Sequence, residues 1–164
     1  VYVGFGSMSG STGAERGQMV VKALQKSGQR GLLASGWGGL QTSELPETIF
    51  QIDAAPHDWL FPRVAAVVHH GGSGTTAAGL RAGKPTIICP FIADQPFWGK
   101  VVYEAGVGPH PIPQKKLTVD GLAAAITTAV TDPAMQQRAA DLGAKVRAEA
   151  GVACAVALLE AAVR

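Results

Sequence analysis

Residues 69–95 constrain the fold of this chain more than any other stretch, and they read HHGGSGTTAAGLRAGKPTIICPFIADQ. An apolar run over residues 64–68 precedes them and predicts a buried strand. A glycine pair then predicts a turn, and a helix over residues 73–82 is followed by a second buried strand over residues 85–90. A strand, a glycine-rich turn and a helix in this order aim free backbone N–H groups and the positive end of a helix dipole at one point. The stretch therefore predicts an anion site, with phosphate as the expected occupant.

The residues around this turn are the first candidate ligands. His70 has an imidazole that can donate a hydrogen bond to a phosphate oxygen, whereas His69 is expected to be structural. The predicted phosphate ligands of the turn itself, mainly through backbone N–H groups, are Gly72, Ser73, Gly74 and Thr75. Two simpler alternatives stay open: His70 bonded only to the loop backbone, and Ser73 or Thr75 acting as an ordinary helix cap.

A second group of candidates follows the next strand. Asp94 and Gln95 come just beyond its carboxyl end, where ligands bind in open α/β sheets. A carboxylate and an amide can share hydrogen bonds with neighbouring hydroxyl groups. Together with the anion site, they indicate a phosphate-linked, hydroxyl-rich ligand such as a nucleotide sugar. The alternative is that Asp94 only caps a helix with Pro96 in its first turn.

The rest of the chain predicts a single domain, residues 1–164, of the α/β class: a Rossmann-like, doubly wound parallel sheet with helices on both faces. Further strands are predicted over residues 1–5, 31–35 and 49–53, with a short, proline-broken edge strand over residues 107–112. Further helices are predicted over residues 14–27 and 95–105, after Thr118, from Asp132 and over residues 152–164. Thr118 is a predicted cap, and Leu117 and Leu122 stand at the positions of a hydrophobic staple.

Two other residues are candidates because they follow strands at this edge. Ser7 lies in a Gly/Ser loop whose N–H groups could approach a phosphate, and Trp37 follows the second strand and could stack on a base. An ordinary strand–helix loop is the alternative for Ser7, and packing is the alternative for Trp37. A dinucleotide fingerprint is excluded in the Ser7 loop, because Gly10 comes one residue too late for GxGxxG.

Composition, net charge and the cysteine pattern indicate the class of protein, the partners that are not favoured and the expected location. Hydrophobic residues make up 47% and charged residues 16%, so a globular domain is expected. A net charge of +2 does not favour nucleic acid or an anionic membrane as a partner. The two cysteines form no CxxC motif, no apolar run approaches the roughly 20 residues of a membrane span, and the chain opens directly on a strand. We therefore expect free thiols and a cytoplasmic location.

The motifs HHGGSGTT, AGKP and PFIADQPFWG resemble the donor-binding signature of nucleotide-sugar glycosyltransferases with the two-domain GT-B fold. Within them, the chain is most similar to bacterial natural-product and sterol glucosyltransferases. The resemblance implies that this is the second half of such an enzyme, without the acceptor-binding amino-terminal half. It also implies that the catalytic base, a histidine, belongs to that missing half, so no catalytic residue is expected in this chain.

The resemblance also implies particular roles for the candidates. It places Ser7 and His70 near the donor phosphates, Asp94 and Gln95 on the glucose, and the segment of His57 on the nucleobase. A ribose-binding glutamate of the plant enzymes is absent, because Ala78 and Gly79 occupy that region, so the choice of nucleotide stays open.

The expected function is the donor half of an inverting, metal-independent transferase. It would move a hexose, with glucose expected, from a UDP- or dTDP-sugar to a lipophilic alcohol such as a sterol or polyketide. No cofactor and no metal are expected, because the chain has no Asp-x-Asp motif and the turn supplies N–H donors instead. The alternatives are a nucleotide-sugar epimerase or hydrolase of the same architecture, and a non-catalytic nucleotide-sugar binding module. In isolation the domain is expected to be inactive and to self-associate through exposed apolar surface, including the helix from Val152.

Overall fold

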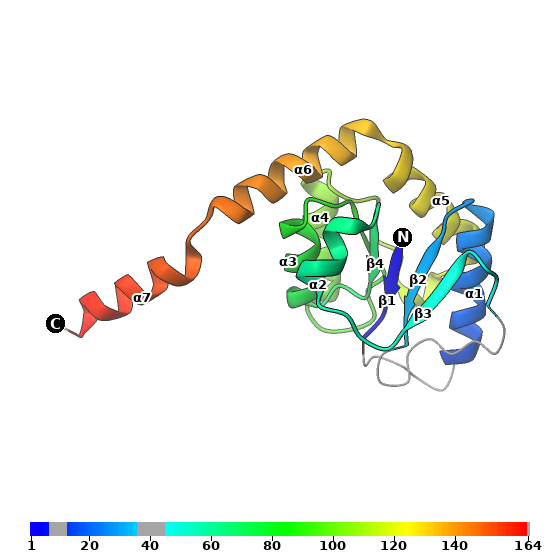
Figure 1. Ribbon diagram of the computed structural model, residues 1–164, viewed down its shortest axis with the longest axis horizontal. Helices are drawn as coiled ribbons and strands as arrows, with labels where there is room; N and C mark the ends of the chain where they lie inside the picture. Colours follow the sequence, from blue (N-terminus) through cyan, green and yellow to red (C-terminus); the bar gives the residue numbers. More distant parts are fainter. Residues whose placement is uncertain (7–12, 36–44, 164) are drawn as a thin grey trace.

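The computed structural model describes residues 1–6, 13–35 and 45–163. Its centre is one sheet of five parallel strands in the order β3-β2-β1-β4-β5 (Figure 1). The strands are β1 (Tyr2–Gly4), β2 (Gly31–Ala34), β3 (Ile49–Ile52), β4 (Val67–His69) and β5 (Thr86–Ile88). The order reverses between β1 and β4, as in a doubly wound sheet, so the predicted fold class is confirmed.

Helices cover both faces of this sheet (Figure 1). The α-helices are α1 (Gly13–Lys26), α2 (His57–Leu60), α3 (Ser73–Arg81), α4 (Gln95–Glu104), α5 (Val119–Thr131), α6 (Pro133–Ala148) and α7 (Gly151–Ala162), and the 3₁₀ turns are Phe61–Arg63 and Gln114–Lys116. One core lies between the sheet and the packed pair α1 and α5, and a smaller core lies under α2 and α3 on the opposite face. Because both faces are buried, the short strands read as nearly continuous apolar runs.

Helix α5 begins as its sequence predicts. The Oγ1 atom of Thr118 accepts a hydrogen bond from the N–H of Gly121 at 3.1 Å. Leu117 and Leu122 are both buried in the larger core, as expected of a hydrophobic staple. The carboxylate of Asp132 caps α6 in the same way, accepting from the N–H groups of the first turn.

The predicted edge strand over residues 107–112 was wrong. The segment lies beside β5 but makes only two ladder-like bonds there, from Thr86 N to Val107 O and from Ile112 N to Ile88 O, both 3.0 Å. Prolines alternate through this stretch and lack the N–H that a continuous ladder needs. The edge of β5 is therefore covered by an irregular segment.

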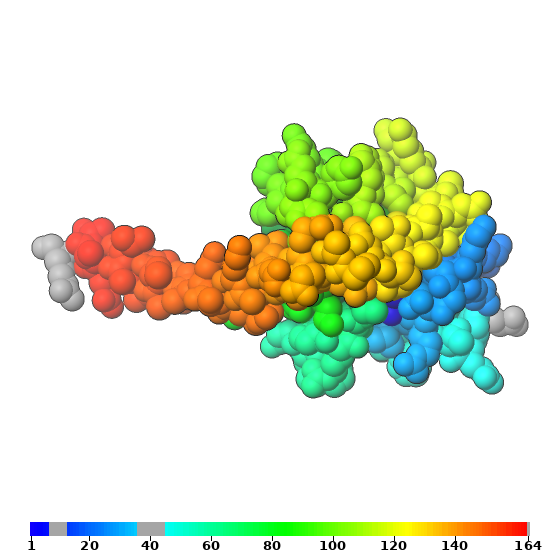
Figure 2. All heavy atoms as spheres, turned by 90° about the horizontal axis from the view of Figure 1, so that it is seen from above, coloured from blue at the N-terminus to red at the C-terminus, as the bar shows by residue number. Residues whose placement is uncertain are grey.

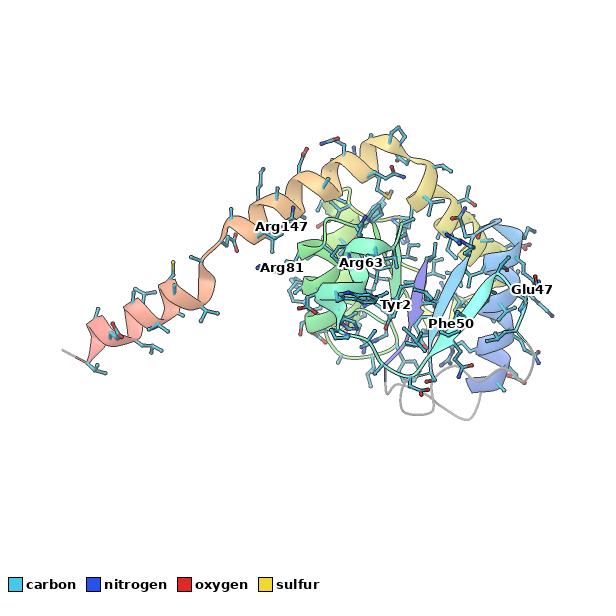
Figure 3. All side chains as sticks on the ribbon, in the orientation of Figure 1. Tyr2, Glu47, Phe50, Arg63, Arg81 and Arg147 are labelled. Atoms are coloured by element: carbon cyan, nitrogen blue, oxygen red, sulfur yellow. The ribbon has the colours of Figure 1, made fainter. Side chains whose placement is uncertain are left out.

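Helices α6 and α7 close the chain. Helix α6 packs across α3, and two hydrogen bonds join these helices. Arg147 of α6 donates to the backbone carbonyl of Arg81 of α3, and Arg81 donates to the backbone carbonyl of Val146 (Figure 3). Helix α7 then projects away from the body, and none of its residues is buried (Figures 1 and 2). In the described part of the chain, no helix combines the length and apolar character that crossing a membrane requires.

Candidate functional site

Three loops meet at the carboxyl edge of the sheet, after β1, β4 and β5. A Cβ atom built on Gly6 would lie 3.1 Å from Cε1 of His70, so the first loop touches the second. A Cβ atom built on Gly71 would lie 3.2 Å from Cβ of Gln95, so the second touches the third. The tertiary structure therefore brings together the two groups of candidate ligands that the sequence separates.

The turn after β4 leaves the amino terminus of α3 open. The N-cap residue is Gly72, which has no side chain to satisfy the first-turn N–H groups. The amide and the Oγ1 atom of Thr76 both donate to the carbonyl of Gly72 at 2.9 Å and fix the first turn. The N–H groups of Ser73, Gly74 and Thr75 consequently have no acceptor inside the helix. Neither Ser73 nor Thr75 is the cap, and a Cβ atom built on Gly74 would meet nothing within 4 Å.

His69 holds this turn from inside the protein. It is fully buried, and its Nδ1 atom accepts a hydrogen bond from the N–H of Gly71 at 2.9 Å. Burial lowers the pKa of His69 to about 3, and the neighbouring His70 and His57 contribute to this lowering. A neutral ring with its proton on Nε2 fits these contacts. His69 thus has the structural role that the sequence suggests.

His70 is the imidazole that faces the site. Its half-buried ring lies between two glycines: Cβ atoms built on Gly6 and Gly72 would lie 3.1 Å from Cε1 and 2.7 Å from Nε2. The buried Nδ1 atom has no hydrogen-bond partner among the described residues. Burial lowers the pKa of His70, while the carboxylate of Asp94 acts in the opposite direction. The neutral ring can therefore donate one hydrogen bond at the open end of α3.

Asp94 is exposed at the start of α4. It is the N-cap residue by position, but its side chain makes no capping hydrogen bond. Its Oδ2 atom instead accepts from the indole Nε1 of Trp98 at 2.8 Å. The alternative in which Asp94 only caps the helix is therefore wrong, and the carboxylate stays available at the surface.

Gln95 is buried behind Asp94. Its Oε1 atom accepts hydrogen bonds from the N–H groups of Phe91 at 2.8 Å and Ile92 at 3.1 Å. Both hydrogen bonds to the side-chain oxygen of Gln95 thus come from the loop backbone, and only its side-chain Nε2 is left for a ligand. Sequence reasoning missed this supporting role and also missed Trp98, although Trp98 stands at the i+4 position that meets Asp94 on a helix.

His57 lies in a neighbouring hollow at the same edge. Its ring stacks on Phe61 with centroids 4.3 Å apart and meets Tyr2 edge-on at 5.9 Å. It also lines a cavity of about 170 Å³, together with Gly6 after β1, Ala34 at the end of β2 and Asp53 after β3. Burial lowers the pKa of His57, against the opposing effect of the Asp58 carboxylate. His57 therefore packs against Phe61 and borders a hollow that also reaches Gly6, the residue next to the His70 ring.

Two predicted site residues, Ser7 and Trp37, lie outside the described residues. Within the described part of the chain, no three His, Cys, Asp or Glu side chains gather closely enough to hold a metal ion.

The coupling between Asp94 and His70 leads to a first prediction. Replacing Asp94 by asparagine removes the charge that favours imidazolium, so the pKa of His70 should fall further below its usual range. Titration of the imidazole signals by NMR would measure this shift. An unchanged pKa for His70 would show that the carboxylate does not face the ring.

The strand order, with its reversal between β1 and β4, places this chain among the doubly wound α/β domains. The family model "Erythromycin biosynthesis protein CIII-like, C-terminal domain" matches residues 37–161. The chain belongs to this family, and the resemblance to the C-terminal domain of GT-B glycosyltransferases is confirmed.

Relatives and solved structures agree with this family. The chain is 46% identical to a sterol 3-beta-glucosyltransferase of Arabidopsis thaliana, over 95% of this chain and 26% of that protein. It is 48% identical to one of Aspergillus clavatus, over 95% of this chain and 12% of that protein. The chain therefore spans about a quarter or less of the length of these relatives.

Solved structures match the same fold. The crystal structure of the glycotransferase of kitacinnamycin matches over 97% of this chain and 42% of that chain, with a TM-score of 0.82 and 25% identity. The fold also matches the glycosyltransferase VinC in complex with dTDP, with a TM-score of 0.69 and 19% identity over 90% of this chain and 37% of that one.

Proposed function

We propose that this domain binds the UDP- or dTDP-hexose donor of a glycosyltransferase, with UDP-glucose as the first ligand to test. One observation carries the proposal: the amino terminus of α3 has no side-chain cap and lies beside His70, a half-buried imidazole on which the exposed carboxylate of Asp94 also acts. Free N–H groups and a helix dipole suit a diphosphate. The relatives are named as glucosyltransferases, and VinC was crystallised in complex with dTDP, which supports the same ligand class.

The same arrangement accounts for the chemistry that the donor half contributes. Negative charge grows on the diphosphate as the glycosidic bond breaks, and N–H groups already aimed at that oxygen stabilise it without rearrangement. His70 would add a hydrogen bond there, and Asp94 would accept hydrogen bonds from sugar hydroxyls. We also propose that the transfer inverts the sugar configuration and needs no metal ion. The base that activates the acceptor would lie on the amino-terminal acceptor domain.

The acceptor and the partner domain are proposed from the relatives and from exposed apolar surface. A lipophilic alcohol fits the names of the sterol glucosyltransferases. Phe91, Ile92 and Phe97 are all more than half exposed and flank Asp94 in the sequence. Helix α7 also exposes Leu158 and Leu159. We propose that an amino-terminal acceptor domain covers these surfaces and that the isolated domain self-associates through them.

A cytoplasmic location completes the proposal. Cys89 is buried and Cys154 exposed, and both are free thiols, as expected in a reducing compartment. Burial raises the pKa of Cys89 to about 12, which keeps this thiol protonated and unreactive.

Calorimetric titration of this chain with UDP, UDP-glucose and dTDP-glucose, with and without EDTA, tests the proposal. Replacing His70 by alanine should weaken binding of all three ligands by about 10- to 100-fold, because a hydrogen bond to a charged phosphate is lost. Replacing Asp94 by alanine should weaken only the sugar-bearing ligands. His110→Ala and Asp141→Ala, which change exposed residues outside the site, should bind as the unchanged chain does.

Two results would contradict the proposal. Binding abolished by EDTA would contradict metal independence. A folded chain that binds none of the three ligands would show that this turn is not by itself a donor site.

A further inference from the structure

The carboxylate of Asp94 is held in an unusual way for its position. An aspartate before a proline in the first turn of a helix normally accepts hydrogen bonds from the next backbone N–H groups. Here the side chain makes no such bond, and Oδ2 accepts from Nε1 of Trp98, one helical turn further on, at 2.8 Å. The Asp94 carboxylate is thus hydrogen-bonded to the Trp98 indole on the exposed surface of α4 and does not cap the helix.

The Trp98 ring is itself held in place. It is half-buried and meets the ring of Phe97 edge-on, with centroids 5.3 Å apart and planes at 74°. Phe97 is mostly exposed, so Trp98 is the inner member of this aromatic pair. A half-buried indole with a fixed orientation is a better anchor for a carboxylate than a flexible polar side chain.

The backbone that carries Asp94 has a separate support. Ala93 adopts a left-handed conformation with φ of 60°, which is costly for a residue other than glycine. The buried Oε1 of Gln95 accepts from Phe91 N and Ile92 N on the other side of Ala93 and holds the loop in this shape. Gln95 therefore fixes the backbone of the loop, and Trp98 fixes the side chain of Asp94.

The anchored carboxylate keeps one oxygen for a ligand. Among the described residues, none donates a hydrogen bond to Oδ1 of Asp94, and the charge of the group reaches His70 across the site. A carboxylate that is already oriented loses little conformational freedom when it accepts hydrogen bonds from a hydroxyl-rich ligand. Released from the indole, it would turn back towards the N–H of Phe97 in the first turn of α4.

We propose that Trp98 is a positioning residue: its indole N–H orients the Asp94 carboxylate for the hydroxyl groups of the donor sugar. This inference rests on the proposed function, because it assumes that Asp94 meets the sugar.

Trp98→Phe is the test variant, since it removes the N–H and keeps an aromatic ring in place. In calorimetric titrations of this chain, we expect its affinity for UDP to be unchanged and its affinity for UDP-glucose to fall about three- to tenfold, as for loss of one hydrogen bond. The matched control is Trp59→Phe, because Trp59 is exposed on α2 and contacts Arg63 through its ring face. This control should change neither affinity.

A double-mutant cycle separates positioning from a direct contact. If Trp98 acts through Asp94, Trp98→Phe should cause no further loss of UDP-glucose affinity in the Asp94→Ala background. Equal losses in both backgrounds would overturn the inference, as would a loss of UDP affinity in the single variant.

The failure of this inference can be told apart from failure of the proposed function. An unaffected Trp98→Phe beside a weakened Asp94→Ala would overturn only the positioning role. Unweakened sugar binding by Asp94→Ala would overturn the sugar contact and the positioning role together. In either case, comparing the UDP affinity of the unchanged chain with that of His70→Ala would still test the proposed phosphate site, because UDP carries no sugar for Asp94 to contact.

Discussion

Lowering the pH from 6.5 to 4 is expected to reduce the free energy of unfolding by about 3 kcal/mol through His69 alone. His69 is fully buried in the folded protein, where burial, with smaller effects from His70 and His57, lowers its pKa from 6.5 to about 3. Above pH 6.5 neither state binds the proton, so stability is unaffected. Between pH 6.5 and pH 3 only the unfolded chain binds it, so stability falls as the pH falls.

Urea denaturation at half-unit pH intervals would measure this loss. His69→Asn is the matched variant, because its side-chain oxygen can replace Nδ1 as the acceptor for the Gly71 N–H and does not titrate. The variant should be less stable at pH 7 and should lose less stability between pH 6.5 and 4. Parallel pH profiles for the two proteins would show that His69 is protonated without unfolding.

Replacing Gly71 by alanine is expected to lower the free energy of unfolding by about 2 to 4 kcal/mol. Gly71 has φ of 97°, a conformation that side chains other than glycine rarely adopt. Its added Cβ would lie 2.7 Å from Cγ2 of Ile88 and 3.1 Å from the carbonyl oxygen of Gln95. To relieve these contacts, the turn after β4 would have to move away from the loop after β5. The affinity for the proposed nucleotide-sugar donor should therefore fall as well.

Gly74→Ala provides the control for this prediction. Position 74 is in the first turn of α3, has no positive φ, and leaves open space around an added Cβ. Its stability in urea should match that of the unchanged protein or exceed it slightly. Equal stability for the two alanine variants would contradict the tight contact at Gly71.

The sequence predicts well those features that depend on neighbouring residues. The strand, the glycine turn and the start of α3 follow each other within about ten residues. Thr118 and Leu122 set the start of α5 by the same local rules. The prolines near residue 110 were visible too, but their effect on the ladder beside β5 was underestimated.

Features that depend on contacts between loops were not predictable in the same way. Gln95 is expected to contact the sugar, and the structure shows that its buried side-chain oxygen accepts hydrogen bonds from two backbone N–H groups, those of Phe91 and Ile92. His57 was expected at the nucleobase, and the structure shows that one face of its ring is already stacked on Phe61. Buried polar groups take the partners that the packed structure offers them, and the sequence does not show those partners.

The sequence by itself determined the order of the main elements, the parallel sheet and the glycine turn before α3, because period, turn residues and caps act over a few neighbours. Only the tertiary structure decided that Gly6, Gly71 and Gln95 touch, and that Asp94 turns to Trp98 and leaves its own helix uncapped. The physical reason is that parallel strands bring distant loops to one edge of the sheet, where close packing and competition for hydrogen bonds select among side-chain orientations that are locally equivalent.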